Sequence, residues 1–304
     1  MIKIKKNIPL APFSTFKIGG KVKFFCEVRN DSELLEAIRA AKRLKTPYKI
    51  IAGGSNIVFP DTRLNCLLIK IKSNKLRFIS NKIIVDAGVE LGKVIRFAIK
   101  HGLKGLETLS GIPGTIGGAI AGNAGAYGHS ISEVIEKVEI LDDGKKRWIR
   151  NKECQFSYRK SIFKQNPFII LRIVLKFKKG NLNELKKISR DIIQLRLKKY
   201  KPGLRCPGSF FKNVLVKDVS ERSFKQIDQG KIIDGKIPAG YLLEEVGAKG
   251  MRRGGIQIAD FHGNLFINQG GARAGDVKKL SQILKAKVKR KFGILLEEEI
   301  RYFN

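Results

Sequence analysis

The sequence has few of the residues that build metal sites and disulfide frameworks. Its four cysteines and three histidines are Cys26, Cys66, Cys154, Cys206, His101, His129 and His262. None of the cysteines forms a Cys-x-x-Cys pair, and no two histidines lie close together in the chain. This spacing indicates neither a zinc site nor a disulfide framework. We therefore expect buried free thiols and no bound metal.

Long apolar runs are also missing. No stretch approaches the roughly 20 apolar residues that a membrane-spanning helix needs, and residues 1–9 lack the apolar core of a signal peptide. We therefore expect a cytoplasmic protein without membrane insertion.

Acidic residues are scarce relative to basic ones. The chain has 27 Asp and Glu against 61 Lys and Arg, a formal net charge of +34. A charge of this size attracts polyanions, so a basic RNA-binding or membrane-surface protein is one alternative. The basic residues are spread along the chain, however, without a block interleaved with stacking aromatics. We expect no dedicated nucleic-acid partner, and nothing in the sequence indicates a protein partner.

Glycine, in contrast, is concentrated in residues 109–128, which are too rich in it to form an ordinary helix or strand. Glycine lets successive N–H groups turn toward one concave surface and approach an anion or a flat polar ring. A flexible linker is the alternative, but Ile112, Ile116 and Ile120 recur every four residues, unlike a polar linker. We interpret the segment as a packed ligand-binding loop.

A second glycine turn, residues 52–56, follows the apolar strand expected at 48–51. Its backbone N–H groups and its Ser and Asn side chains can bind a pyrophosphate. The chain contains neither the Rossmann fingerprint nor a P-loop motif. Two such loops therefore predict a dinucleotide that is bound by neither a Rossmann unit nor a P-loop.

The remaining pattern predicts alternating helices and strands with a boundary between two domains at about 180–205. Helices are expected at 31–45, 91–100, 181–200, 240–246 and 276–291. Strands are expected at 48–51, 57–59, 83–88, 168–177, 256–258, 265–267 and 295–302, with a hairpin over 134–150. In the last strand Glu297 and Glu299 should face one side and Leu296 and Ile300 the other.

Three polar residues are candidates for chemistry, and each has an ordinary structural explanation. Arg159 could form a structural ion pair, Ser209 could be a turn serine, and Glu299 could lie on a solvated strand face.

Five motifs favour chemical roles for these three residues over the structural explanations. They are residues 13–20, 52–56, 110–128, 158–163 and 208–213, and in this order they resemble the UDP-N-acetylenolpyruvoylglucosamine reductase (MurB) family over nearly the whole chain. The short stretch between Phe177 and Lys198 leaves no room for the extra tyrosine-bearing loop of one branch. The resemblance therefore points to the shorter, second branch.

The resemblance implies an enzyme of peptidoglycan precursor synthesis that uses FAD and NADPH to reduce the enolpyruvyl ether of a UDP-sugar, giving UDP-N-acetylmuramate. It implies an α+β fold with a PCMH-type FAD-binding domain at 1–180, in two subdomains of about 1–72 and 73–180. A smaller α+β substrate-binding domain would follow at 181–304, with its last strand packing back toward the flavin. Another PCMH-type flavin oxidase or dehydrogenase is the alternative within enzymes.

The resemblance also implies roles for particular residues. Ser209 matches the proton donor, Arg159 the cation that stabilises the developing enolate, and Glu299 a carboxylate that orients or shares a proton with it. The implied cofactor-binding residues are Gly53, Gly54, Ser55, Asn56, Ser110, Gly111, Pro113, Gly114, Thr115, Gly118, Asn123, Gly125 and Ala126. The implied substrate-binding residues are Tyr158, Arg159, Lys212 and Asn213, and Lys212 would help to polarise Ser209.

Overall fold

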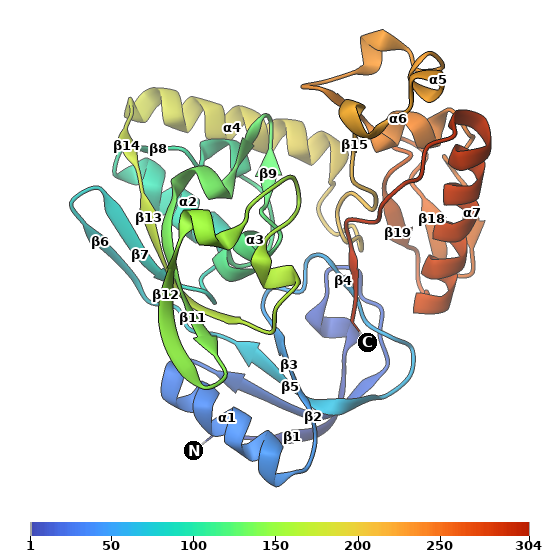
Figure 1. The fold of residues 1–304 in the computed structure, drawn as a ribbon. Coiled ribbons are helices and arrows are strands. Elements are labelled where there is room, and N and C mark those ends of the chain that lie inside the picture. The colour runs from blue at the N-terminus through green and yellow to red at the C-terminus, as the bar shows by residue number, and fades with distance from the viewer. Residues whose placement is uncertain (1, 304) are drawn as a thin grey trace. The chain divides into compact units, whose positions relative to one another are not determined.

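The structure, a computed structural model, describes residues 2–303 as two compact units (Figure 1). Unit 1 comprises the chain up to Ile8, Val22–Gly53 and Asn65–Lys198. Unit 2 comprises Pro9–Lys21, Gly54–Leu64 and the chain from Lys199 onward. Each unit is therefore assembled from stretches that are far apart in the sequence.

One sheet of the fold has the strand order β1 (Lys5–Pro9), β2 (Lys21–Val28), β5 (Leu64–Ile71) and β3 (Tyr48–Ile51). Strands β3 and β5 run parallel. Helix α1 (Asp31–Arg43) buries Leu34, Ala37 and Ala41 in a core that it shares with strands β2 and β5. The Asn30 side chain caps the helix by accepting a hydrogen bond from the Glu33 N–H at 2.9 Å.

A second, antiparallel sheet in unit 1 has the order β12 (Lys145–Arg150), β11 (Ile135–Asp142), β13 (Ile169–Lys176), β7 (Lys82–Asp86) and β6 (Leu76–Ile79). The β11–β12 hairpin turns at Asp143 and Gly144, whose φ angles of 43° and 78° suit the tight turn expected from Asp-Gly. Helices α2 (Leu91–Lys100) and α3 (Ile116–Ala121) pack their apolar side chains into the core of this sheet.

Helix α4 (Leu182–Lys199) comes after β13 and the short strand β14 (Lys178–Lys179), and it buries Leu185 in the same core. Its residues up to Lys198 therefore belong to unit 1, whereas the sequence predicts this helix in the second domain. The assignment of functions to domains remains a prediction.

Unit 2 is built around the small sheet β17 (Arg252–Arg253), β18 (Ile256–Ile258) and β19 (Phe266–Asn268). Helices α6 (Ala239–Glu244) and α7 (Ala274–Phe292) contribute to its core, in which the rings of Phe210 and Phe266 stack with centroids 3.7 Å apart. Strand β20 (Arg301–Tyr302) pairs in parallel with β4 (Ile57–Val58).

The shorter elements complete the fold. They are β8 (Leu103–Lys104), β9 (Gly125–Ala126), β10 (His129–Ser130), β14 (Lys178–Lys179), β15 (Val214–Leu215), α5 (Glu221–Phe224) and β16 (Lys236–Ile237). No helix within residues 2–303 combines the length and the apolar character that crossing a bilayer requires.

Two local predictions were wrong. The glycine-rich segment does contain a helix, α3, because Thr115 caps it and the bare Gly117 allows it to pack directly on Ala87. The strand expected over 295–302 forms only at β20. The residues before it make isolated β-bridges, such as that between Phe211 and Glu298, instead of a continuous strand.

Candidate functional site

The two glycine loops meet within unit 1. A Cβ atom placed on Gly53 would lie 2.6 Å from the Gly114 Cα atom, closer than side chains approach backbone. The bare backbone of one loop therefore packs on that of the other. Gly118 differs, because it is exposed and a Cβ atom there would meet only Thr115 Oγ1 at 3.6 Å and Ala52 Cβ at 4.0 Å. Open backbone surface thus remains where α3 faces the Ala52–Gly53 turn.

Several other glycines are required by the fold itself. A Cβ atom on Gly117 would lie 2.8 Å from Ala87 Cβ, and one on Gly125 would lie 2.7 Å from the His129 carbonyl oxygen. Gly54, in unit 2, has φ +68° and would place a Cβ atom 1.9 Å from the Phe13 carbonyl oxygen. These glycines are explained by close packing within each unit, without any ligand.

The polar side chains of the glycine-rich segment have different surroundings. Thr115 Oγ1 accepts from the Gly118 N–H at 3.3 Å, and the Ser110 and Ser189 hydroxyls lie 2.7 Å apart. Buried Asn123 donates through Nδ2 to the Ser157 carbonyl at 2.9 Å. Its Oδ1 has no hydrogen-bond partner within the described residues, which leaves a buried acceptor that a ligand N–H can satisfy.

Arg159 lies in a turn that is fixed to the glycine-rich segment. The backbones of Ser157 and Lys160 hydrogen-bond reciprocally around it, and Arg159 itself has φ 57°. Besides the Asn123 bond, the Ser161 hydroxyl donates to the Ala121 carbonyl at 2.8 Å. The guanidinium carbon lies 5.6 Å from the Tyr158 ring centroid. Unit 1 therefore brings Tyr158 and Arg159 beside the segment that includes Asn123.

Ser209, in unit 2, follows a glycine with φ +89° and precedes two buried phenylalanines. Asn264 fixes this turn with its amide: Oδ1 accepts from the Phe211 N–H and Nδ2 donates to the Phe211 carbonyl, both at 2.8 Å. The Phe210 N–H also donates to the Asn264 carbonyl at 3.1 Å. Asn264 is 2% exposed, and the sequence pattern did not predict its role.

The neighbours of the Ser209 hydroxyl are the last residue of α4 and the residue that follows the helix. Tyr200 Oη lies 3.1 Å and Lys199 Nζ 3.4 Å from Ser209 Oγ. The sequence predicts Lys212 in this role, but Lys212 Nζ lies 2.5 Å from Glu297 Oε1. Nothing in the sequence marks Lys199 and Tyr200, because neither belongs to the motif around Ser209.

Glu299 is held on both sides by its backbone. Its N–H donates to the Phe210 carbonyl at 2.8 Å, and its carbonyl accepts from Asn56 Nδ2 at 3.0 Å. Unit 2 therefore brings together the backbone beside Ser209, Glu299 and the predicted cofactor residue Asn56. Asn213 Oδ1 accepts from the Ala239 N–H at 3.2 Å.

Burial controls protonation near this turn. It lowers the pKa of His262 to about 4, with the positive charge of Lys199 adding to the effect. The neutral imidazole can then accept from the Asn264 N–H, which lies 3.0 Å from Nδ1. Burial also raises the pKa of the Cys206 thiol, which disfavours the reactive thiolate.

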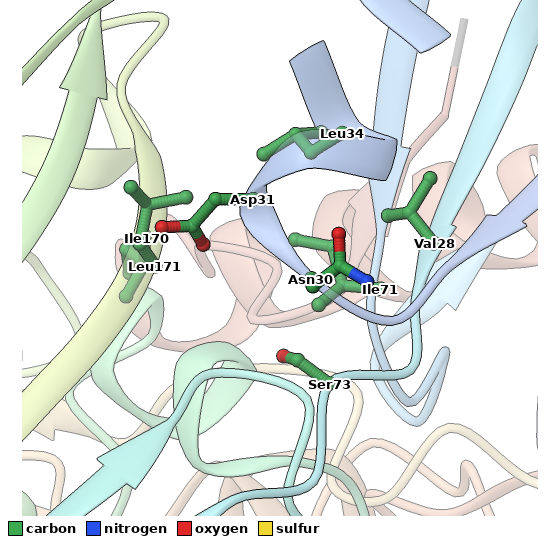
Figure 2. Close-up of a pocket in the computed structure, with 8 residues that line it drawn as sticks. All are labelled: Val28, Asn30, Asp31, Leu34, Ile71, Ser73, Ile170 and Leu171. Carbon is green, nitrogen blue, oxygen red and sulfur yellow. The ribbon is translucent and has the colours of Figure 1, made fainter. Parts of the chain in front are cut away.

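A small pocket in unit 1 is not part of this arrangement. It is lined by Val28, Asn30, Asp31, Leu34, Ile71, Ser73, Ile170 and Leu171 (Figure 2). None of these is a predicted site residue, and the Asp31 carboxylate pairs with Lys146 and Arg172. We assign no function to this pocket.

Comparison with known families assigns the α+β fold and its paired glycine loops to the FAD-binding class. A family model described as FAD binding domain matches residues 22–149, and one described as UDP-N-acetylenolpyruvoylglucosamine reductase, C-terminal domain, matches residues 199–303. The first match includes the glycine loops and the second includes Ser209 and Glu299, whereas Arg159 lies between them.

Relatives that match over nearly their full length support the same family. The chain is 39% identical over 300 residues to the UDP-N-acetylenolpyruvoylglucosamine reductase of Solibacter usitatus, covering 98% of this chain and 96% of the relative. It is 36% identical to that of Thermotoga maritima, covering 96% and 95%. The crystal structure of the Thermus caldophilus enzyme (MurB) matches with a TM-score of 0.78 and 28% identity, over 100% of each chain.

The chain therefore belongs to the UDP-N-acetylenolpyruvoylglucosamine reductase family. This confirms the family and the α+β fold class that the sequence motifs predict.

Proposed function

We propose that this chain reduces UDP-N-acetylenolpyruvoylglucosamine to UDP-N-acetylmuramate with NADPH, through FAD. The observation that carries this conclusion is its match to reductases of that name over 98% of its length. It is thus an FAD-containing oxidoreductase of peptidoglycan precursor synthesis, as predicted.

The residues of unit 1 fit a bound flavin dinucleotide. Gly53 and Gly118 expose backbone, and the buried Asn123 Oδ1 is an acceptor without a partner among the described residues. When bound, FAD would supply the hydride transfer from NADPH to the vinyl carbon of the substrate. The residues proposed to hold it are Gly53, Gly54, Ser55, Asn56, Ser110, Gly111, Pro113, Gly114, Thr115, Gly118, Asn123, Gly125 and Ala126.

Ser209 is the proposed proton donor to the carbon beside the substrate carboxylate. A hydroxyl is a weak acid, but the electron pair on that carbon makes it a strong base, so a hydroxyl within hydrogen-bond reach suffices. The amide of Asn264 supports this role by fixing the backbone that follows Ser209.

Arg159 and Glu299 are the proposed charged groups of the reaction. A guanidinium held in a fixed turn stabilises the negative charge that develops on the substrate, without reorganisation. The carboxylate of Glu299, on a backbone held by Phe210 and Asn56, orients the enolate or shares its proton. Tyr158, Arg159, Lys212 and Asn213 are proposed to bind the UDP-sugar.

We also propose that residues 1–180 bind FAD and residues 181–304 bind the UDP-sugar. A cytoplasmic location is part of this proposal, with the UDP-sugar and NADPH as small-molecule partners. The anionic charges of both would be attracted by the net charge of +34.

The test is a steady-state assay of the purified protein. We expect a yellow protein that releases FAD on heating and oxidises NADPH only when the enolpyruvyl UDP-sugar is present. The product should carry two more hydrogens than the substrate. A yellow protein that passes electrons to oxygen but not to the sugar would instead be a flavin oxidase, and a colourless protein that binds RNA at physiological salt would refute the proposal.

A further inference from the structure

The hydroxyl of Ser209 belongs to a short chain of polar groups within unit 2. Tyr200 Oη lies 3.1 Å from Ser209 Oγ, and Lys199 Nζ lies 3.4 Å from the same oxygen. Lys199 Nζ also lies 5.2 Å from the centroid of the Tyr200 ring. A phenol and an ammonium therefore both adjoin the predicted proton donor.

The Tyr200 ring is anchored by apolar contacts. It packs, partly buried, against the cluster formed by Cys206, Ala259, Leu265 and Ile267. Leu265 in turn forms a β-bridge with Ser209. The residues that hold the phenol therefore include the one that pairs with the serine, which favours a constant separation between the two hydroxyls.

We propose that Tyr200 replaces the proton of Ser209 as that proton leaves. This inference rests on the proposed function. As the new C–H bond forms at the carbon beside the substrate carboxylate, the Ser209 O–H bond breaks. That O–H bond is remade from the Tyr200 hydroxyl, whose own O–H bond breaks. The negative charge ends on the Tyr200 phenolate, and a proton from solvent restores the phenol.

Acid strength favours the phenol as the source of this proton. A serine that donates alone would become an alkoxide, whereas a phenol is a much stronger acid than an aliphatic alcohol. The phenolate would form beside the ammonium of Lys199, so opposite charges would attract. Donation by Lys199 would instead remove that positive charge when negative charge is developing on the substrate.

The first test compares Tyr200→Phe with wild type under anaerobic conditions. NADPH should reduce the flavin of both at the same rate, whereas reoxidation by the enolpyruvyl sugar should be about 10- to 100-fold slower in the variant. A plot of the reoxidation rate against the fraction of D2O in the solvent should be curved in wild type, since two protons move. The same plot should be linear in the variant, since one proton moves. Tyr241→Phe, which removes a hydroxyl that accepts from the Asp228 N–H, is the matched control and should behave as wild type.

A double variant tests whether Tyr200 acts through the serine. In a Ser209→Ala background, Tyr200→Phe should cause no further loss, because the relay is already broken. Equal losses in both backgrounds would contradict the proposal, and so would unchanged reoxidation in Tyr200→Phe. A Lys199→Met variant that alone removes the curvature would make the lysine the donor.

If the sugar fails to reoxidise the wild-type flavin, the proposed function itself fails; if only the Tyr200 effects are absent, the relay alone is wrong.

Discussion

Gly118→Ala separates binding of the cofactor from stability of the fold. Gly118 is exposed within α3, and the nearest atoms to an added Cβ, Thr115 Oγ1 and Ala52 Cβ, lie at ordinary contact distances of 3.6 and 4.0 Å. Since nothing clashes, replacing a helical glycine should stabilise the FAD-free protein by about 0.5–1 kcal/mol. The added methyl would nevertheless occupy backbone surface that we assign to FAD.

The expected result is an increase of at least about tenfold in the dissociation constant of FAD, equivalent to roughly 1.4 kcal/mol. Flavin fluorescence titration of the stripped protein measures this constant, and urea denaturation of the same sample measures stability. Gly92→Ala is the matched control, because Gly92 lies in α2 and its added Cβ would meet only the flexible end of Arg96 at 3.3 Å. Unchanged FAD affinity in a stabilised Gly118→Ala protein would refute the assignment of Gly118.

Two further predictions concern the turn that presents Ser209. Asn264→Ala leaves the buried N–H and carbonyl of Phe211 without their partner, so the free energy of unfolding, measured by urea denaturation, should fall by about 2–4 kcal/mol, and a fall below about 1 kcal/mol would contradict the contact. Burial lowers the pKa of His262 from 6.5 to about 4, so between pH 6.5 and pH 4 the unfolded chain binds a proton that the folded protein does not. Stability should therefore decrease from pH 6.5 to 4 by on the order of 2 kcal/mol more in wild type than in His262→Gln, and equal decreases would show that His262 is not responsible.

Local patterns predicted most of the regular elements. The apolar spacing over 91–100 and 256–258 gave the bounds of α2 and β18 correctly, and Asp-Gly identified the β11–β12 turn. Each of these elements is determined by residues close together in the chain, where side-chain periodicity and turn chemistry act directly.

The sequence could not predict contacts between distant segments. Asn264 bonds with Phe211, 53 residues away, and Asn56 bonds with Glu299, 243 residues away. Tyr200 reaches Ser209 because of where α4 ends, which no motif encodes. Nor does composition distinguish Gly117, which the packing of α3 requires, from Gly118, whose backbone is open.

The most direct test of the account is anaerobic mixing of the NADPH-reduced enzyme with the enolpyruvyl UDP-sugar, in wild type and in Ser209→Ala. We predict that the sugar restores the oxidised flavin spectrum of wild type within a turnover, and that the serine variant is reduced normally but reoxidised about 100-fold or more slowly. A sugar that leaves the wild-type flavin reduced would contradict the proposed reaction, and equal slowing of both half-reactions would make Ser209 a structural residue.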